Sequence, residues 1–302
     1  MNARSTGRVG FGLLAALSIS VTNVFTHLHY EAGSNPVTFL VGRYVLFVAL
    51  LGLWLGATGR LRLAAPADRF HLWGAGLLNA AGASSLSFAI ERLPVALAIA
   101  ILYLFPIVTL LLDRAVRRVP PPPALLAALL VAFAGLALAL DVRGVVPDPA
   151  GIGFALFAAT AIAASFVWVD HALPTMQSLV RTFRLGVAGL AFAAALAAGT
   201  GDLVWPLPSA RTGATLLVAS ASFAVAYLAM FRSIAVAGAP TTSLLMNLEP
   251  PATVVLAFLV LGEALGALQL AGVAITVAAV VAAQRLADRP PAENPVRCDS
   301  PS

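Results

Sequence analysis

Long apolar stretches, each close to the length of a membrane-spanning helix, follow one another along this chain and are separated by short polar segments. A transmembrane helix needs about 20 apolar residues, and in lipid its backbone polar groups must be satisfied within the same segment. The stretches do not alternate between apolar and polar positions, as the strands of a membrane barrel would. The pattern therefore predicts an all-α integral membrane protein with ten transmembrane helices. The expected spans are 9–29, 36–57, 70–90, 94–112, 122–140, 151–169, 178–199, 212–231, 240–261 and 266–284.

The composition excludes a soluble protein and makes the basic residues a guide to orientation. Only 10% of the residues are charged, and the mean hydropathy is +0.95, whereas a soluble domain carries about 25% charged residues. All 18 basic residues are arginine, and they are spread over short loops rather than gathered in a patch suited to nucleic acid. With the N-terminus in the cytoplasm, twelve arginines lie in inner segments and three in outer loops, as the positive-inside rule requires. We expect a multi-pass protein of the cell inner membrane with both termini cytoplasmic and a disordered cytoplasmic tail at 286–302.

The two halves of the chain repeat one another. Shifting the sequence by 144 positions places FPIVTLL (105–111) on EPPATVV (249–255), with Pro106 on Pro250. The transitions between polar and apolar segments agree around this alignment without a gap.

The repeat predicts the arrangement of the whole chain. Near the start of each half, the segment 35–47 aligns with 176–188, which places Arg43 on Arg184. We expect one five-helix unit at 9–140 and a second at 151–284. Because the number of helices in each unit is odd, the second unit is inverted relative to the first. Inverted repeats with a binding site near the membrane midplane are a recurring design of secondary transporters.

Three stretches carry a resemblance to a known family. They are Pro36 followed by Arg43, the segment LYLFPIVTLLLD (102–113), and the segment 239–275 with its Leu-Glu-Pro, its Leu-Gly-Glu and its later glycine. Together they resemble the EamA-type family of the drug/metabolite transporter superfamily, and the similarity of layout covers nearly the whole chain. One departure is that the first half has Arg118–Val119 where the second has Gly262–Glu263.

The resemblance implies a function. It implies a secondary active transporter that moves a small metabolite or drug, such as an amino-acid-like compound, in the direction of export. Alternating access would open a central cavity between the halves to each side in turn. The family has a glutamate at the position of Glu263. Because the first half has Val119 there, any role of this glutamate is expected only in the second half.

Glu249 is the first candidate for a substrate or coupling site. It lies nine residues beyond Pro240, which places it roughly 14 Å into the membrane, near the midplane. Pro250 and the proline after it remove backbone donors, so freed carbonyls near Asn247 would add to a polar centre. The functional interpretation is a substrate or proton site, and the alternative is a structural acid bonded to a neighbouring helix. The equivalent position in the first half is Phe105.

Other polar groups lie inside the expected spans. Arg43, about 10 Å from the outer face, would bind a substrate carboxylate, or it would simply snorkel. Asn23 and His27 are four residues apart and share a helix face.

Four further residues are cavity candidates at mid-helix depth. They are Asn79, Tyr103, Trp168 and Tyr227. Each would line a cavity or, alternatively, hold neighbouring helices together by hydrogen bonds.

Structural roles are expected for five residues. The prolines Pro106 and Pro250 interrupt helices, and Gly272 permits a close helix approach. Gly262 and Glu263 are expected to cap the turn before the last helix, where a carboxylate meets free amides. No metal site and no cofactor are expected.

The alternatives to transport are an integral membrane enzyme and a scaffold. The sequence contains no His-Glu-x-x-His, no Gly-x-Ser-x-Gly and no P-loop, and it contains no lysine. We therefore expect no enzyme activity and no nucleotide-binding subunit. The expected partners are a small-molecule substrate, membrane lipids and protons as the coupling ion, with no nucleic acid.

Overall fold

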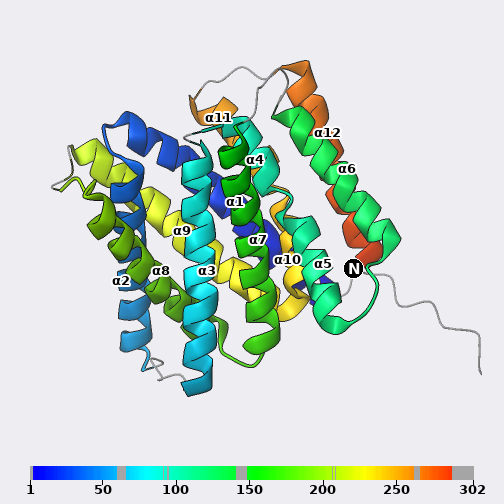
Figure 1. Cartoon of the computed structure of the whole chain (residues 1–302), viewed down its shortest axis with the longest axis horizontal. Helices are drawn as coiled ribbons and strands as arrows, with labels where there is room; N and C mark the ends of the chain where they lie inside the picture. The colour runs from blue at the N-terminus through cyan, green and yellow to red at the C-terminus, as the bar shows by residue number, and fades with distance from the viewer. Residues whose placement is uncertain are drawn as a thin grey trace, which may run out of the picture.

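The computed structural model describes residues 3–59, 66–90, 92–93, 95–140, 148–205, 207, 209–261 and 266–287, and in these ranges every regular element is a helix. The helices are α1 (Ala3–Glu31), α2 (Pro36–Ala57), α3 (Pro66–Ile90), α4 (Val95–Leu102), α5 (Phe105–Arg117), α6 (Pro123–Ala139), α7 (Pro149–Ala172), α8 (Ser178–Thr200), α9 (Ala210–Ala237), α10 (Ala239–Met246), α11 (Glu249–Leu261) and α12 (Ala267–Ala287). Figure 1 shows them as one elongated bundle.

The bundle is built to cross a membrane many times. Over the described residues, 8 helical segments are long and apolar enough to span one, and α6 is a shorter apolar helix. Large apolar side chains such as Leu53, Phe70 and Leu259 are exposed on the outside of the bundle, where lipid tails would cover them. The expectation of an all-helical membrane protein is confirmed, and the count of ten spans stays a prediction.

Two of the expected spans are interrupted. The expected spans 94–112 and 240–261 correspond to Leu97–Arg117 and Ala239–Val260, which are each long and apolar enough to cross a membrane. Each of them consists of two helices. α4 ends at Leu102 and α5 begins at Phe105, while α10 ends at Met246 and α11 begins at Glu249.

The prolines explain the position of both breaks. Proline has no N–H to give to the preceding turn, and it disfavours helical geometry in the residue before it. Pro106 and Pro250 are the second residues of α5 and α11. The breaks are 144 positions apart, which is the offset of the sequence repeat.

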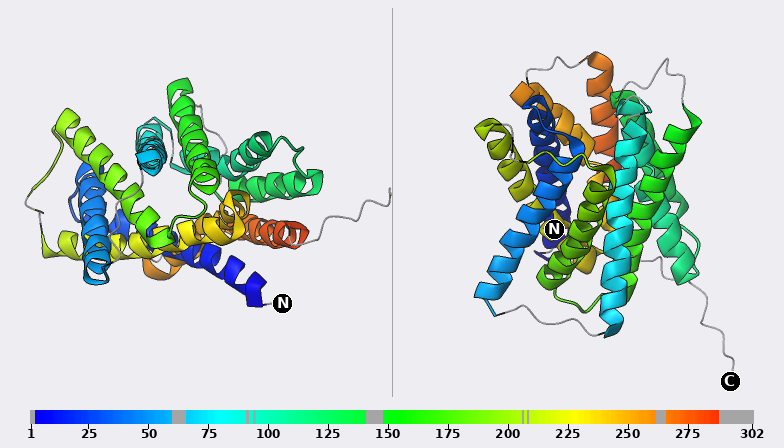
Figure 2. Two further views of the ribbon diagram at one scale, coloured as in Figure 1. Left: turned by 90° about the horizontal axis from the view of Figure 1, so that it is seen from below. Right: turned by 60° about the vertical axis from the view of Figure 1, so that its left-hand side comes forward.

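Each half of the chain packs mainly on the other half. α1 packs along α9 and α3 along α7, whereas α2 packs on α8 and α6 on α12. Exchanging α1–α6 with α7–α12 converts these pairs into one another. The start of α1 and the end of α12 lie at the same end of the bundle, which is the lower end in Figure 1, and Figure 2 shows the interleaving from two further sides.

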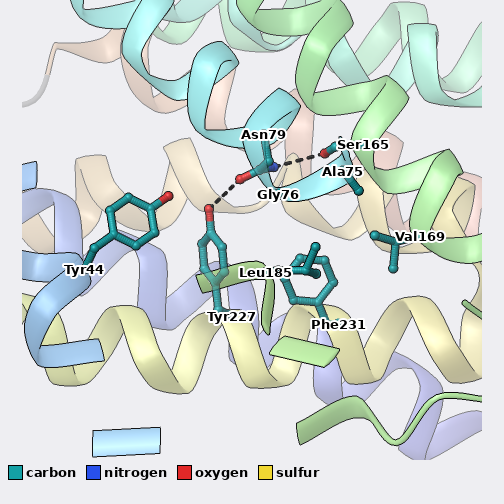
Figure 3. Close-up of a pocket in the computed structure, with 9 residues that line it drawn as sticks. All are labelled: Tyr44, Ala75, Gly76, Asn79, Ser165, Val169, Leu185, Tyr227 and Phe231. Atoms are coloured by element: carbon teal, nitrogen blue, oxygen red, sulfur yellow. Dashed lines mark hydrogen bonds between the residues drawn. The ribbon is translucent and has the colours of Figure 1, made fainter. Parts of the chain in front are cut away.

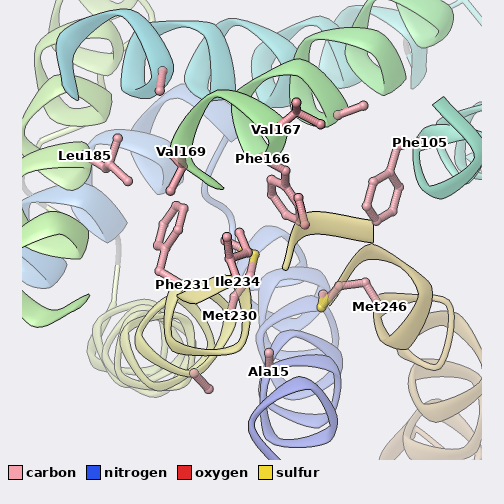
Figure 4. Close-up of a cluster of buried hydrophobic side chains, with 14 of the residues drawn as sticks. Ala15, Phe105, Phe166, Val167, Val169, Leu185, Met230, Phe231, Ile234 and Met246 are labelled. Carbon is pink, nitrogen blue, oxygen red and sulfur yellow. The ribbon is translucent and has the colours of Figure 1, made fainter. Parts of the chain in front are cut away.

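The main hydrophobic core lies where α7, α9 and α10 meet α1 and α5. Figure 4 shows Phe105, Phe166, Phe231 and Met246 converging there from four helices. Phe105 contacts the ring of Phe166 with 5.9 Å between centroids. Because Phe105 is the first residue of α5, its packing in the core holds the first helix break beside α7.

α6 and α12 approach each other through small residues. Thr276 donates a hydrogen bond to the carbonyl oxygen of Ala132 at 3.3 Å, and the two residues are one repeat offset apart in the chain. A Cβ atom added at Gly272 would lie 2.3 Å from the backbone nitrogen of Ala139 and 2.6 Å from the carbonyl oxygen of Gly135. Only a glycine leaves room for this contact. Gly262 and Glu263, expected to cap the turn before α12, lie outside the described residues.

The α6–α12 contact gives a stability prediction. Gly272→Ala is expected to destabilise the protein by about 1–3 kcal/mol, because overpacking forces the two backbones apart. The control is Gly153→Ala in α7, where an added Cβ would meet nothing within 4 Å. Thermal unfolding in detergent should show a lower midpoint for Gly272→Ala only. Equal midpoints for the two variants would contradict the close approach.

Candidate functional site

The carboxylate of Glu249 is held at the break between α10 and α11. It accepts a hydrogen bond from the Asn23 amide of α1 at 2.9 Å, and the hydroxyl of Tyr103, at the other break, is a second partner. Ser20 donates to the backbone carbonyl oxygen of Glu249 at 2.9 Å. The two helix breaks therefore meet at one acidic side chain, which α1 covers from the side.

The Glu249 carboxylate is partly exposed and has only neutral hydrogen-bond partners among the described residues. Glu249 is half-buried and Asn23 is exposed, whereas Tyr103 is buried. Among the described residues, no ion pair to Glu249 is found, and its partners are neutral donors. A carboxylate with neutral partners and an open side can accept a proton or bind a cationic group.

A pocket lies on the other side of the core, between helices of both halves. Tyr44, Ala75, Gly76, Asn79, Ser165, Val169, Leu185, Tyr227 and Phe231 line it. Figure 3 shows their side chains pointing toward one another from α2, α3, α7, α8 and α9. The pocket has room for about one water molecule, so a metabolite would enter only after the helices move apart.

A chain of hydrogen bonds crosses this pocket. The hydroxyl of Tyr227 donates to the amide oxygen of Asn79 at 2.9 Å, and the amide nitrogen of Asn79 donates to Ser165 at 3.0 Å. Ser165 donates in turn to the carbonyl oxygen of Ile162 at 2.8 Å. The remaining lining is apolar or aromatic, so the pocket combines a neutral polar row with aromatic walls.

The structure thus brings the predicted site residues together in two groups. Glu249, Asn23 and Tyr103 form the first group, and Asn79 with Tyr227 belongs to the second.

Three predicted residues lie elsewhere. The Asn247 amide is buried and donates to the carbonyl of Leu244 at 3.3 Å, so it satisfies an acceptor near the break. The Trp168 indole donates to His71 at 2.9 Å between α7 and α3, outside the pocket lining. His27 is exposed and pairs with Glu31 at 3.3 Å.

Arg43 contacts aromatic rings. Its guanidinium carbon lies 4.2 Å from the ring centroid of Phe223 and 5.5 Å from that of Tyr44. Such cation–π contacts stabilise a charge at low solvation. Since Tyr44 lines the pocket, Arg43 borders the pocket through this ring.

Several polar residues of the structure were not among the predicted site residues. Ser165 completes the polar row, and His29 is fully buried and bonds the carbonyl of Thr212 at 3.0 Å. At the lower end of the bundle, ligand atoms of Asp113, Asp170 and His171 lie within 4.8 Å of one another. Metal-binding spacing is not evident from the sequence, because Asp113 and His171 are 58 residues apart. The one signal in the sequence was Asp113 itself, a single acidic residue at the end of an apolar stretch.

Comparisons with known proteins agree with this architecture. The model of the EamA-like transporter family matches residues 8–140 and 149–283. Among solved structures 29 chains match; one, described only as the crystal structure of a protein, has a TM-score of 0.77 and 18% identity over 93% of this chain and 98% of that chain. That likeness shows the fold alone, and the search of curated proteins found no match. Because the family model matches both halves and nearly the whole length, the chain belongs to the EamA-like transporter family, a group within the drug/metabolite transporter superfamily.

Proposed function

We propose that this protein is a secondary active transporter that moves a small metabolite or drug across the cell inner membrane by alternating access. The observation that carries the proposal is the Glu249 carboxylate, half-buried where the two helix breaks meet. An ionisable group at membrane depth is costly and marks an ion or substrate pathway. Its neutral partners, Asn23 and Tyr103, leave it free to exchange a proton or to bind a substrate cation.

The symmetry of the packing supports alternating access. The interhelix pairs convert into one another when the halves are exchanged, and both breaks lie at equivalent positions. We infer that α4–α5 and α10–α11 are each one broken span. The chain then has ten spans in two inverted units, within 9–140 and 151–284, related by a pseudo-two-fold axis in the membrane plane.

The two groups of the site suggest what is carried. The neutral aromatic pocket suits an apolar or aromatic body, and the carboxylate of Glu249 suits an amino group. An amino-acid-like compound has both features, and we propose export as the direction. Gradients rather than ATP would supply the energy, with protons as the coupling ion at Glu249.

A comparison of metabolites tests the proposed function. Cells that overproduce the protein and cells that lack it are grown under the same conditions, and the metabolites of medium and cytoplasm are compared without prior selection. Export predicts at least one compound that rises in the medium and falls in the cell with increasing protein. If the two strains show identical metabolite profiles in every stress and nutrient condition tested, the proposed transport is contradicted.

Glu249→Gln tests the coupling role once a substrate is identified. The amide keeps the size and hydrogen bonding of the side chain but cannot titrate. Purified protein in liposomes is expected to lose flux driven by an imposed pH gradient while it retains substrate exchange. The control is Glu31→Gln, which changes an exposed glutamate of the same chain and should leave flux unchanged. Flux in Glu249→Gln that still follows the pH gradient would make this residue structural only.

Tyr227→Phe tests the pocket. It removes the hydroxyl that donates to Asn79 and leaves a buried acceptor unpaired, which costs about 1–3 kcal/mol. We expect the KM for the substrate to rise about tenfold, with Tyr30→Phe at the exposed end of α1 as the control. An unchanged KM in both variants would separate this pocket from substrate binding.

The arginine bias tests the orientation. A reporter active only in the cytoplasm, fused after Ser302, is expected to be active, and a reporter active only outside should be active within the 143–148 loop. If the outside reporter is active after Ser302 and the cytoplasmic reporter is active within 143–148, the orientation is the reverse of the expected one. Silence of both expected fusions would contradict the ten-span arrangement.

A further inference from the structure

Four charged or titratable side chains join α5 to α7 at the lower end of the bundle. Asp113 is buried, with only 3% of its side chain exposed. Its carboxylate accepts hydrogen bonds from Nε of Arg117, at 2.9 and 3.1 Å, and it contacts Nε2 of His171 at 2.9 Å. Arg117 also reaches Asp170, with 3.8 Å between NH2 and Oδ2.

The cluster crosses the boundary between the two repeats. Asp113 and Arg117 belong to α5 of the first half, whereas Asp170 and His171 belong to α7 of the second. Asp170 also accepts a hydrogen bond from the backbone N–H of Ala239 at 3.0 Å, so the start of α10 is tied to the same group.

Further charges surround the cluster. The fully buried guanidinium of Arg181 donates to the carbonyl oxygens of Leu173 and Phe231, and it interacts electrostatically with Asp170 and Arg232. The side chains of α5, α7, α8 and α9 therefore contribute to one network of charges that closes this end.

The described residues of the opposite end are packed differently, although α1 packs on α11 as α7 packs on α5. α10 packs against α5 and α7, whereas in the described residues no comparable packing joins their repeat equivalents, α4 with α11 and α1. The ion pair across the halves at that end, Arg92 with Asp148 at 3.5 Å, is half-exposed. Asn23 is exposed and Glu249 is half-buried. Among the described residues, the contact of α10 with α5 therefore has no counterpart in the other half, whereas the largest interhelix contacts do.

We propose that Asp113, Arg117, Asp170 and His171 form a latch that holds the cytoplasmic end shut while the outer end is open. The inference rests on the proposed function and names the contact that must break in each cycle. The ligand spacing of the acids and His171 would also suit a cation, but Arg117 already occupies both oxygens of Asp113. A buried charge that loses its partner is strongly disfavoured, so the latch is either fully formed or fully separated.

The latch is tested by access to the pocket rather than by transport. In a Cys298→Ser background, Ala75→Cys places a single thiol in the pocket lining, where Ala75 is 1% exposed. A membrane-impermeant maleimide is added to inverted vesicles, whose cytoplasmic face is outside, and the labelling rate is measured. Adding Asp113→Asn is expected to raise the rate about tenfold or more, because several hydrogen bonds to a charged group are weakened.

Matched variants keep the outcome interpretable. Asp148→Asn removes the charge of the half-exposed pair at the other end while an asparagine still caps α7, and it should leave the cytoplasmic labelling rate unchanged. Asp113→Glu retains the charge and should keep the rate close to the parent value. Size-exclusion chromatography and thermal unfolding confirm that each variant folds.

The results separate the latch from the transport function. An unchanged rate in folded Asp113→Asn, or an equal rise in Asp148→Asn, would overturn the latch even if the protein transports a substrate. An increase seen only in right-side-out vesicles would also overturn it, because the gate would then lie at the other end. A selective increase from the cytoplasmic face supports the latch whether or not a substrate has been found.

Discussion

The fold depends on the absence of water in the membrane interior. There, every backbone N–H and C=O group needs a partner within the protein, so the chain forms helices wherever lipid surrounds it. Departures from helical geometry are tolerated only where other groups replace the lost hydrogen bonds. Polar side chains also bond the backbone around the second break, where Asn247 donates to the carbonyl of Leu244 and Ser20 donates to the carbonyl of Glu249. Ser20 bonds the backbone of the same Glu249 whose carboxylate forms the candidate site.

The breaks therefore connect structure with function. The second break gives α11 a free helix start inside the bundle, and it places Glu249 there together with Asn23 and Tyr103. The first break lies one repeat offset earlier and carries Phe105, which packs into the apolar core. The same backbone geometry thus holds a titratable group in one half and a hydrophobic anchor in the other. This asymmetry suits a transporter in which one half carries the coupling group.

Much of the architecture could be predicted from the sequence, and the reasons are local. Apolar stretches of sufficient length predict helices, and the shift that aligns Pro106 with Pro250 predicts the repeat. The pairing of Asn23 with Glu249 could not be predicted, because the two residues are 226 positions apart and meet only through helix packing. Trp168 and His27 are also polar or amphipathic residues near helix ends, yet their partners place them away from the pocket. The latch was missed for the same reason, since it joins side chains from α5 and α7.

Alternating access requires that the two ends of the bundle open in opposite senses, and distances between spin labels measure this directly. In the Cys298→Ser background, one pair of labels at 119 and 175 reports on the lower end, and a second pair at 92 and 260 reports on the upper end. All four positions are exposed. When Asp113→Asn weakens the latch, we expect a longer distance across the lower end and a shorter distance across the upper end. A change at only one end, or no change at either, would contradict it.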